Sequence, residues 1–422
     1  MCRFIVYKGI EPILLSHLVT RPLHSIINQA FESRLRLPSS RPMNADGFGL
    51  GWYDALPPSQ AAVNALSKTV TPTAPPHERD SQSSQVIRPP IATAHLQSHE
   101  SVVMIDGDGH EEADEKAAVL KKLRHEEREL EKERPCLFKS LSPAWSNANL
   151  TRLAEKICSP LVFAHVRAST MAGAPNEDNC HPWVFDKLMW MHNGQVCGVV
   201  FAIHTQLIGA QIIDFQKIKR ALQMSLPEEL FLYPSGYTDS EWAFMVFLSR
   251  LKDPHARSFT HVELRNAMME TILFINELCK DAGVTGSHLL NFVVSDGETV
   301  VATRYIASRT SEASSLFFSS GTSFDEYREG GLYRMTKADK RESVIMIASE
   351  PLTFERREWM EVKTNTMIVI TPKMNLLQIP IIDEFWVAPQ DPASYQRSKE
   401  FAISMGFGHG FASQLASSEV TA

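Results

Sequence analysis

The sequence predicts an α+β sandwich, a fold in which β-sheets pack face to face and the helices are grouped apart from the strands. Three observations favour this class. Strands follow one another in the last third of the chain, the helical segments occur in groups rather than one after each strand, and no internal repeat of about 20–50 residues is visible. With 422 residues, the chain is long enough for one large mixed domain or for two average ones.

The N-terminal segment is predicted to begin with a strand. Residues 3–8 form an alternating β-like run, residues 24–37 a helical stretch, and residues 46–53 a strand punctuated by glycines. Charged residues and a proline interrupt the first apolar run, and no small-residue cleavage site follows it. We therefore expect no secretory signal.

The composition changes from about residue 55 onwards. Prolines, serines and alanines run to about residue 84 without clear periodicity, which is typical of a loop or a disordered insertion. Residues 110–134 are densely charged at helical spacing and predict a solvated surface helix, with the docking of a partner as the alternative. We expect one domain over residues 2–388, interrupted by a flexible, charged insertion at 55–134 and followed by a C-terminal tail at 389–422.

Regular elements resume near residue 135. The pattern predicts a helix over residues 150–157, a buried strand over 161–167, and a second buried strand over 188–191 that ends at His192. Two capping patterns mark later helix starts, because a threonine hydroxyl and a glutamate three positions further on satisfy free backbone amides. These pairs are Thr238 with Glu241 and Thr260 with Glu263.

The final third is predicted to be rich in strands. Asp296-Gly297-Glu298 between two apolar runs indicates a hairpin. The predicted strands cover residues 290–295, 299–305, 315–319, 344–348 and 367–371.

Composition excludes several classes of function. The formal net charge of −7 argues against a general binder of nucleic acid or of anionic membranes, and the apolar stretch at 196–213 contains too many polar residues for a membrane span. Six cysteines are spread without a CxxC pair or metal-ligand spacing, so no metal site is expected. This cysteine usage suits a reducing compartment, and we expect a cytoplasmic protein.

Cys2 stands directly after the initiator methionine. If Met1 is removed, one residue carries both a thiol nucleophile and an α-amine that can act as its base. The α-amine titrates near ~7.7–8.0 and an unperturbed thiol near ~8.5, so both groups can change protonation state at neutral pH. A small buried residue at the start of an edge strand, or a lipidation site, is the alternative interpretation.

Polar clusters at element ends are the other candidates for a site. Arg167, with Thr170 shortly after it, follows a buried strand and can grip a carboxylate through two parallel hydrogen bonds; a surface arginine that closes a strand is the alternative. In His192-Asn193-Gly194, a side-chain amide and a backbone N–H would suit an oxyanion hole, although Asn-Gly is also common in simple turns.

Asp239 lies at a helix N-terminus, where aspartate also favours the helix dipole for reasons unrelated to a substrate. Its functional interpretation is a carboxylate that pairs with a ligand ammonium group. Arg167 and Asp239 together would then hold the two charged ends of an α-amino acid.

These clusters occur in an order that resembles the type 2 glutamine amidotransferases of the N-terminal-nucleophile hydrolase superfamily. The residues that carry the resemblance are Cys2, Asp46-Gly47-Phe48-Gly49, Arg167 with Thr170, Asn179-Cys180-His181-Pro182, His192-Asn193-Gly194, Thr238-Asp239-Ser240-Glu241 and Ala348-Ser349-Glu350-Pro351. Within that family, the chain is similar to fungal amidotransferase-like subunits of a glutathione-degrading complex. That similarity is suggested by residues 21–29, Phe48 and Pro143-Ala144-Trp145.

The resemblance implies a fold and a role for each matched residue. The fold implied is a four-layer αββα sandwich, without any cofactor. Cys2 matches the nucleophile that forms a γ-glutamyl thioester, Asn193 and Gly194 match the oxyanion hole, and His192 precedes them in the substrate site. Arg167 and Thr170 match the α-carboxylate site and Asp239 the α-ammonium site.

The resemblance implies a γ-glutamyl hydrolase that acts on glutathione or glutamine, as a subunit with a metallopeptidase-like partner. A glutaminase subunit that delivers ammonia to a separate acceptor enzyme is the first alternative. A non-catalytic binding module of the same fold is the second.

One departure from the family pattern concerns residues 197–212, which separate the His-Asn-Gly segment from the helix that follows it. An apolar insertion beside an oxyanion hole has no evident function. We interpret it as a retained intron in the gene model, a hypothesis that transcript sequencing tests.

Overall fold

The computed structural model describes residues 2–33, 43–54, 121–122, 131–168, 176–199, 213–338 and 341–404. The chain divides into two compact units, one made of residues 1–55 with 132–422 and the other of residues 56–131. The architecture below is that of the first unit. The predicted charged helix at 110–134 lies almost entirely outside the described residues, as do residues 200–212 of the suspected insertion.

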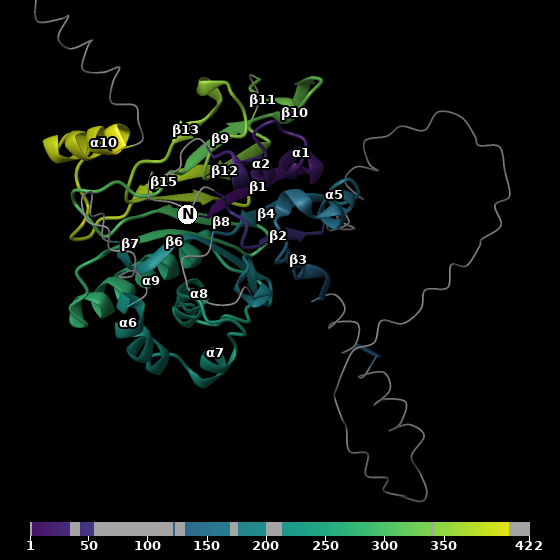
Figure 1. Cartoon of the computed structure of the whole chain (residues 1–422). Helices are drawn as coiled ribbons and strands as arrows, with labels where there is room; N and C mark the ends of the chain where they lie inside the picture. The colour runs from purple at the N-terminus through teal and green to yellow at the C-terminus, as the bar shows by residue number, and fades with distance from the viewer. Residues whose placement is uncertain are drawn as a thin grey trace, which may run out of the picture. The chain divides into compact units, whose positions relative to one another are not determined.

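Two antiparallel sheets form the centre of the first unit (Figure 1). The first sheet has the strand order β13-β9-β12-β1-β4-β2-β3, and the second has the order β15-β14-β8-β7-β6-β5. The strands of the first sheet are β1 (Arg3–Leu14), β2 (Phe48–Tyr53), β3 (Cys136–Ser140), β4 (Cys158–Val166), β9 (Phe317–Gly321), β12 (Val344–Ala348) and β13 (Met360–Glu361). Those of the second are β5 (Trp183–Phe185), β6 (Leu188–Val199), β7 (Ser287–Ser295), β8 (Val300–Arg304), β14 (Thr366–Ile370) and β15 (Leu376–Pro380).

The remaining elements are helices and one separate hairpin. The hairpin pairs β10 (Ser323–Arg328) with β11 (Leu332–Thr336). The helices are α1 (Ser16–Val19), α2 (Ile26–Phe31), α5 (Ala148–Ala154), α6 (Ile213–Met224), α7 (Glu228–Leu232), α8 (Asp239–Ser249), α9 (His261–Asp281) and α10 (Pro392–Ser404).

Alternation along the strands divides the apolar side chains into layers, because successive residues of a strand point to opposite faces. In β1, Phe4 and Val6 join a core between the two sheets, which we call the inter-sheet core, while Ile5 and Tyr7 pack toward α1, α2 and α5. On the far side of the second sheet, a third core is formed with α6, α8 and α9. The order is therefore helix, sheet, sheet, helix, and the predicted αββα sandwich is confirmed.

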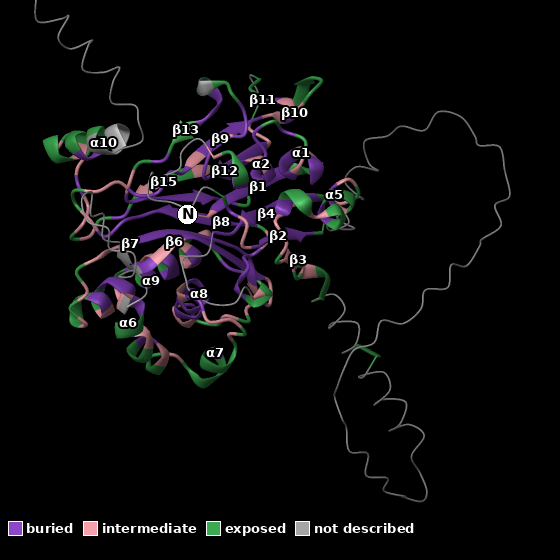
Figure 2. Cartoon of the chain, in the orientation of Figure 1, coloured by how far each residue is buried: buried purple, intermediate pink, exposed green. Residues whose placement is uncertain are grey.

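Burial follows these layers. The central strands of both sheets are buried, whereas α6 and α7 carry exposed residues on their outer faces (Figure 2). β1 has seven consecutive buried positions at its start, which is expected of a strand covered on both faces.

Strand β6 corrects one expectation from the sequence. The strand was predicted to end at His192, but it runs on to Val199, and Asn193 and Gly194 pair with Asn291 and Leu290 of β7. The Asn-Gly dipeptide thus lies inside a strand rather than in a turn. Close approach favours the glycine, since a Cβ on Gly194 would lie 1.8 Å from the Leu289 carbonyl oxygen.

Most other sequence expectations hold with shifted boundaries. β12 has the predicted bounds, and the hairpin of β7 and β8 contains Gly297 at φ +93°. The threonine half of both predicted capping pairs is formed, with Thr238 and Thr260 accepting the N–H groups of Glu241 and Glu263. The Glu241 carboxylate accepts the N–H groups of Ser235 and Gly236, which precede the helix. The helix predicted over residues 24–37 is wrong in extent: α2 begins after Ser25, whose hydroxyl caps it, and ends at Phe31.

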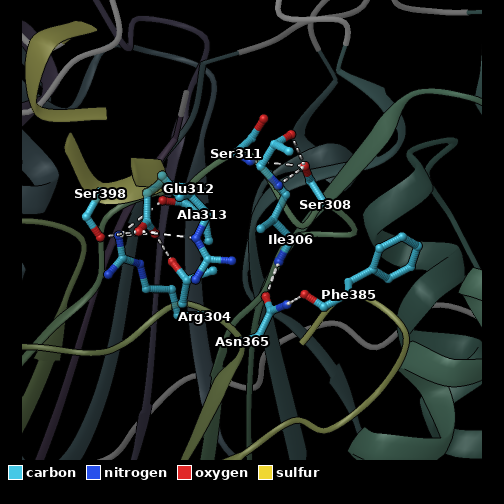
Figure 3. Close-up of polar contacts among 12 residues, drawn as sticks. Arg304, Ile306, Ser308, Ser311, Glu312, Ala313, Asn365, Phe385 and Ser398 are labelled. Carbon is cyan, nitrogen blue, oxygen red and sulfur yellow. Dashed lines mark hydrogen bonds and ion pairs between the residues drawn. The ribbon is translucent and has the colours of Figure 1, made fainter. Parts of the chain in front are cut away.

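The segment after the second sheet includes a helix, α10, that is anchored through buried charges. Glu312 lies between Arg304 of β8 and Arg397 of α10, and its Oε1 accepts a hydrogen bond of 2.8 Å from Ser398 (Figure 3). Arg304 also donates to the Ala313 and Ser314 carbonyl oxygens. Among the described residues, no helix is both long and apolar enough to cross a lipid bilayer.

Candidate functional site

The predicted nucleophile and the predicted oxyanion group share one face of their sheets. Phe4 and Val6 point into the inter-sheet core, so the same alternation directs Cys2 toward it. In β6, Met189 and Met191 belong to this core, and Asn193 follows in the same alternation. The two residues are 191 positions apart in the sequence, yet they extend the same layer of the fold.

Arg167 belongs to this layer as well. In β4, Leu161 and Phe163 line the inter-sheet core, and Arg167 continues their alternation one residue beyond the strand. The pairing persists there, because the Arg167 N–H donates to the Gly47 carbonyl at 2.8 Å. Strand geometry therefore gathers Cys2, Arg167 and Asn193 at one end of the space between the sheets.

The Cys2 thiol lies against the backbone of Ala168. The Ala168 N–H donates to the sulfur at 3.4 Å, and the Ala168 carbonyl oxygen lies 3.7 Å from it. Cys2 is partly exposed, unlike the strand that follows it.

The Arg167 side chain is only 5 % exposed. Within the described part of the chain, its guanidinium makes no ion pair and no hydrogen bond with another side chain. A buried, unpaired charge is costly, and a bound carboxylate would remove that cost. Thr170, which was predicted to act with it, lies outside the described residues.

Asn193 is 1 % exposed and contacts Ser349, which follows β12. The two side chains meet at 3.2 Å, and Asn193 Oδ1 has no hydrogen-bond partner among the described residues. An amide group in which one polar atom has no hydrogen-bond partner is a candidate for contact with a ligand. Sequence reasoning quoted Ser349 in a motif but gave it no role.

Asp239 and His192 form a connected pair on the helix side of the second sheet. Asp239 Oδ2 accepts the Val196 N–H at 2.7 Å, and its Oδ1 accepts the Ser240 N–H at 2.9 Å. The Ser240 hydroxyl lies 2.8 Å from His192 Nδ1 and 3.2 Å from Asp239 Oδ1. Asp239 is thus fixed next to β6. It contacts that strand at Val196, which lies three residues after Asn193.

His192 was predicted in the substrate site, but its ring points away from the face that carries Asn193. Its Nε2 lies 2.9 Å from the Leu289 carbonyl, so Nε2 carries the proton and Nδ1 is left to accept from Ser240. Burial lowers the pKa of His192, against the opposing effect of the Asp239 charge. Both ring nitrogens are engaged within the protein, and the ring supports β6 and Asp239 from behind.

Two further buried histidines lie near the arginine. The His165 and His181 rings are in contact at a tilt of 47°, with centroids 4.0 Å apart, and neither His181 nitrogen has a partner among the described residues. Burial lowers the pKa of His165 to about 3, and burial also holds the pKa of His181 well below its usual value. The positive charge of Arg167 acts in the same direction on both rings, which are therefore neutral near pH 7.

A second polar network, which sequence reasoning missed, anchors the N-terminus. Arg3 pairs with Glu350 at 2.7 Å, both side chains are almost fully buried, and Arg3 also donates to the Cys2 carbonyl at 2.9 Å. His24 and Ser33 contact the same Glu350 carboxylate. The partners are up to 347 positions apart, so local sequence carried no signal for this network beyond the motif that contains Glu350.

The described residues include no group of three or more histidine, cysteine, aspartate or glutamate side chains that could hold a metal ion. The candidate site brings together a thiol, a buried guanidinium, a carboxylate and an amide. This set suits attack on an acyl carbon of a zwitterionic substrate.

Comparison with known proteins gives concordant results. Residues 131–378 match the family model of class-II glutamine amidotransferases. A Saccharomyces cerevisiae protein described as probable glutamine amidotransferase DUG3 is 40% identical over 416 residues, covering 96% of this chain and 90% of that protein.

Two solved structures were also matched. A glutamine aminotransferase class-II domain protein from Silicibacter pomeroyi has a TM-score of 0.46 at 20% identity, with 90% of this chain and 100% of that chain covered. Glutamine phosphoribosylpyrophosphate amidotransferase from B. subtilis has a TM-score of 0.41 at 10% identity, with 90% and 49% covered. The extent of the family match and the identity to the yeast protein establish that this chain belongs to the class-II glutamine amidotransferases.

Proposed function

We propose that the chain hydrolyses a γ-glutamyl amide bond with Cys2 as its nucleophile. After removal of Met1, the Cys2 sulfur attacks the γ-carbonyl carbon, a C–S bond forms, and the carbonyl electrons move onto oxygen. The thiol proton passes through the α-amine of Cys2, directly or through a water, to the leaving nitrogen, and the C–N bond breaks. Water then cleaves the γ-glutamyl thioester, which releases glutamate and restores the thiol.

The other site residues hold the substrate and its developing charge. The Asn193 amide and the Gly194 N–H stabilise the oxyanion, a contribution worth about 10²–10³ in rate for one donor. Arg167 binds the α-carboxylate with help from Thr170, and Asp239 binds the α-ammonium group. Asp239 keeps acceptor capacity for this, because each carboxylate oxygen has two lone pairs and Oδ2 accepts only Val196 N–H within the described part of the chain.

The observation that carries the proposal is the Arg167 guanidinium, which is buried and makes no ion pair among the described residues. Arg167 directly precedes Ala168, whose N–H contacts the sulfur at 3.4 Å. A carboxylate held by this arginine would bring the attached chain of a γ-glutamyl group toward the nucleophile. A merely structural arginine would be expected to pair with a carboxylate of the protein itself.

Glutathione is the substrate that we propose first, with cysteinylglycine as the leaving group. This choice follows the similarity to fungal subunits that degrade glutathione, and it includes a metallopeptidase-like partner subunit and a cytoplasmic location. Glutamine, with release of ammonia to a separate acceptor enzyme, is the second candidate, because the matched family and the yeast relative are both named for glutamine amidotransfer.

The test is an assay of glutamate release from glutathione and from glutamine, with and without candidate partner subunits. Intact mass first establishes that Met1 is absent, since a retained methionine would block the α-amine. Cys2→Ala is expected to abolish turnover of both substrates while leaving the folded state nearly unchanged, because a partly exposed thiol at a chain end supplies little packing.

Cys158→Ala is the matched control, since Cys158 is an exposed cysteine at the start of β4. It should retain wild-type activity. Equal activity in Cys2→Ala and the wild type would refute the mechanism, and turnover of only one substrate would decide between the two candidates.

A further inference from the structure

The Ser349 hydroxyl links the strand of the nucleophile to the oxyanion amide. It accepts the Phe4 N–H at 3.1 Å, two residues after Cys2, and it contacts the Asn193 carboxamide at 3.2 Å. Ser349 is fully buried, and it continues the alternation by which Ile345 and Ile347 of β12 enter the inter-sheet core. No function has yet been given to it.

The two possible orientations of the Asn193 amide differ in how well they satisfy these groups. With the amide nitrogen toward Ser349, the hydroxyl oxygen receives two N–H groups and its own proton finds no acceptor among the described residues. Asn193 Oδ1 is then buried without a partner. Each serine hydroxyl can donate once and accept twice, so this arrangement leaves both a donor and an acceptor unused.

A half-turn of the amide satisfies the hydroxyl proton and Oδ1, and it leaves the two amide N–H groups as the donors without an acceptor among the described residues. The Ser349 hydroxyl then accepts the Phe4 N–H and donates its own proton to Asn193 Oδ1. The amide nitrogen takes the place of the unpaired oxygen and offers two N–H donors to whatever occupies the site. Because the two ends of a carboxamide have nearly the same shape, hydrogen bonds decide which orientation is adopted.

We propose that Ser349 is a positioning residue, which donates its hydroxyl proton to Asn193 Oδ1 and thereby turns the amide N–H groups toward the substrate oxyanion. The inference rests on the proposed function, in which Asn193 is an oxyanion donor. The Ser349 hydroxyl would set the orientation of the Asn193 amide. Stabilisation of the oxyanion depends on that orientation, because only the N–H groups of the amide can donate to it.

The surroundings hold Ser349 firmly enough for this task. Its N–H donates to the Phe4 carbonyl at 3.0 Å, and its own carbonyl accepts from the Ser315 hydroxyl at 2.9 Å. Behind Asn193, the paired residue Asn291 donates to the Ser314 carbonyl at 3.0 Å. Contacts to Phe4 and Ser315 thus fix the Ser349 backbone beside β1, and the orientation of the Asn193 amide is left for the hydroxyl to set.

The kinetic test compares Ser349→Ala with Ser319→Ala. Ser319 is an equally buried serine on β9 of the same sheet, and its hydroxyl has no partner among the described residues. Ser349→Ala is expected to lower kcat on the order of 10-fold or more with KM changed less than about threefold, because the lost interaction acts in the transition state. Ser319→Ala should match the wild type.

A double-mutant cycle separates positioning from general stability. If Ser349 acts through Asn193, Ser349→Ala should cause no further loss of kcat in an Asn193→Ala background. Multiplied effects, or a Ser349→Ala enzyme as active as Ser319→Ala while Asn193→Ala is impaired, would overturn the inference and leave the proposed function standing. Full activity of Asn193→Ala would instead contradict the proposed oxyanion role.

A second measurement needs neither turnover nor a variant. Neutron diffraction from crystals of the wild-type protein in heavy water locates deuterium atoms directly. We expect a deuterium on Ser349 Oγ directed at Asn193 Oδ1. Amide deuterium atoms directed at Ser349 Oγ would overturn the inference whatever the activity of the protein.

Discussion

Arg167 illustrates how a buried charged side chain can destabilise the folded state and still be useful for binding a ligand. Its guanidinium is buried, and within the described part of the chain it makes no ion pair, whereas Arg3, equally buried, pairs with Glu350 at 2.7 Å. A protein can retain an unpaired buried charge when a ligand supplies the missing partner. The contrast between these two arginines separates an anchor of the fold from a candidate binding group.

Replacement of Arg167 by lysine should weaken substrate binding, because an ammonium group cannot reproduce the planar, two-pronged contact with a carboxylate. We expect KM to rise by roughly 10- to 100-fold, the range that corresponds to loss of a charged hydrogen bond. Steady-state kinetics with glutathione and glutamine measure this. Arg21→Lys, at an exposed arginine paired with Glu155, is the control, and an unchanged KM in Arg167→Lys would remove this residue from the carboxylate site.

Elements set the direction of each group in the site. Period-two alternation in β1, β4 and β6 brings Cys2, Arg167 and Asn193 to one face, and the same rule sends His192 to the opposite face. The sequence predicted His192 and Asn193 at the end of a strand, whereas β6 continues to Val199. Which face of the sheet His192 lies on depends on how the sheets and helices pack, and no local pattern contains that information.

The buried histidines of these strands predict a dependence of stability on pH. Because the folded state holds the pKa of His165 and His181 below 6.5, the unfolded chain takes up protons first as the pH falls. Stability contributed by each neutral ring is complete above pH 6.5 and is lost progressively below it, by about 1.4 kcal/mol per pH unit. Acidification below pH 6.5 should therefore weaken the contribution of these two rings to stability, whereas Glu241, whose pKa burial raises to about 7, acts in the opposite direction over the same range.

His181→Phe tests this effect, because neither ring nitrogen of His181 has a partner among the described residues and phenylalanine can fill its place between His165 and Trp183. Between pH 7 and pH 5, the free energy of unfolding of the variant should fall by about 2 kcal/mol less than that of the wild type. Urea unfolding at both pH values measures the difference. His255→Gln, which removes an exposed histidine of raised pKa, should show no such protection, and equal losses in His181→Phe and the wild type would contradict the prediction.

At the scale of the whole molecule, the N-terminus is tied to distant parts of the chain. Arg3 joins Glu350, and through it His24 and Ser33, while Ser349 joins β1 to β6. Ser349 and Glu350 are adjacent, so one turn after β12 contacts both sides of the nucleophile strand. The first sheet thus supports Cys2, the proposed nucleophile, and the second supplies Asn193, the proposed oxyanion donor.

Glu350→Gln should destabilise the protein by about 3–5 kcal/mol, since it leaves the Arg3 charge buried without its counter-ion. In the double variant Arg3→Met, Glu350→Leu, we expect much of this stability to return, whereas kcat should stay low because the Arg3 contact with the Cys2 carbonyl is gone. Urea unfolding and steady-state kinetics give the two readouts. Arg21→Met breaks an exposed pair and should cost less than about 1 kcal/mol; a similar cost for Glu350→Gln would refute the prediction.

The sequence by itself determined the class of fold, most of the strands, and the residues of the candidate site, because alternation and capping are local patterns. It also predicted Cys2 as the nucleophile, since a cysteine at position 2 needs no folding to acquire an adjacent α-amine. Only the tertiary structure decided which face each strand turns toward the second sheet. The contacts of Ser349 and Glu350 likewise depend on register between strands more than 150 positions apart, which no local pattern contains.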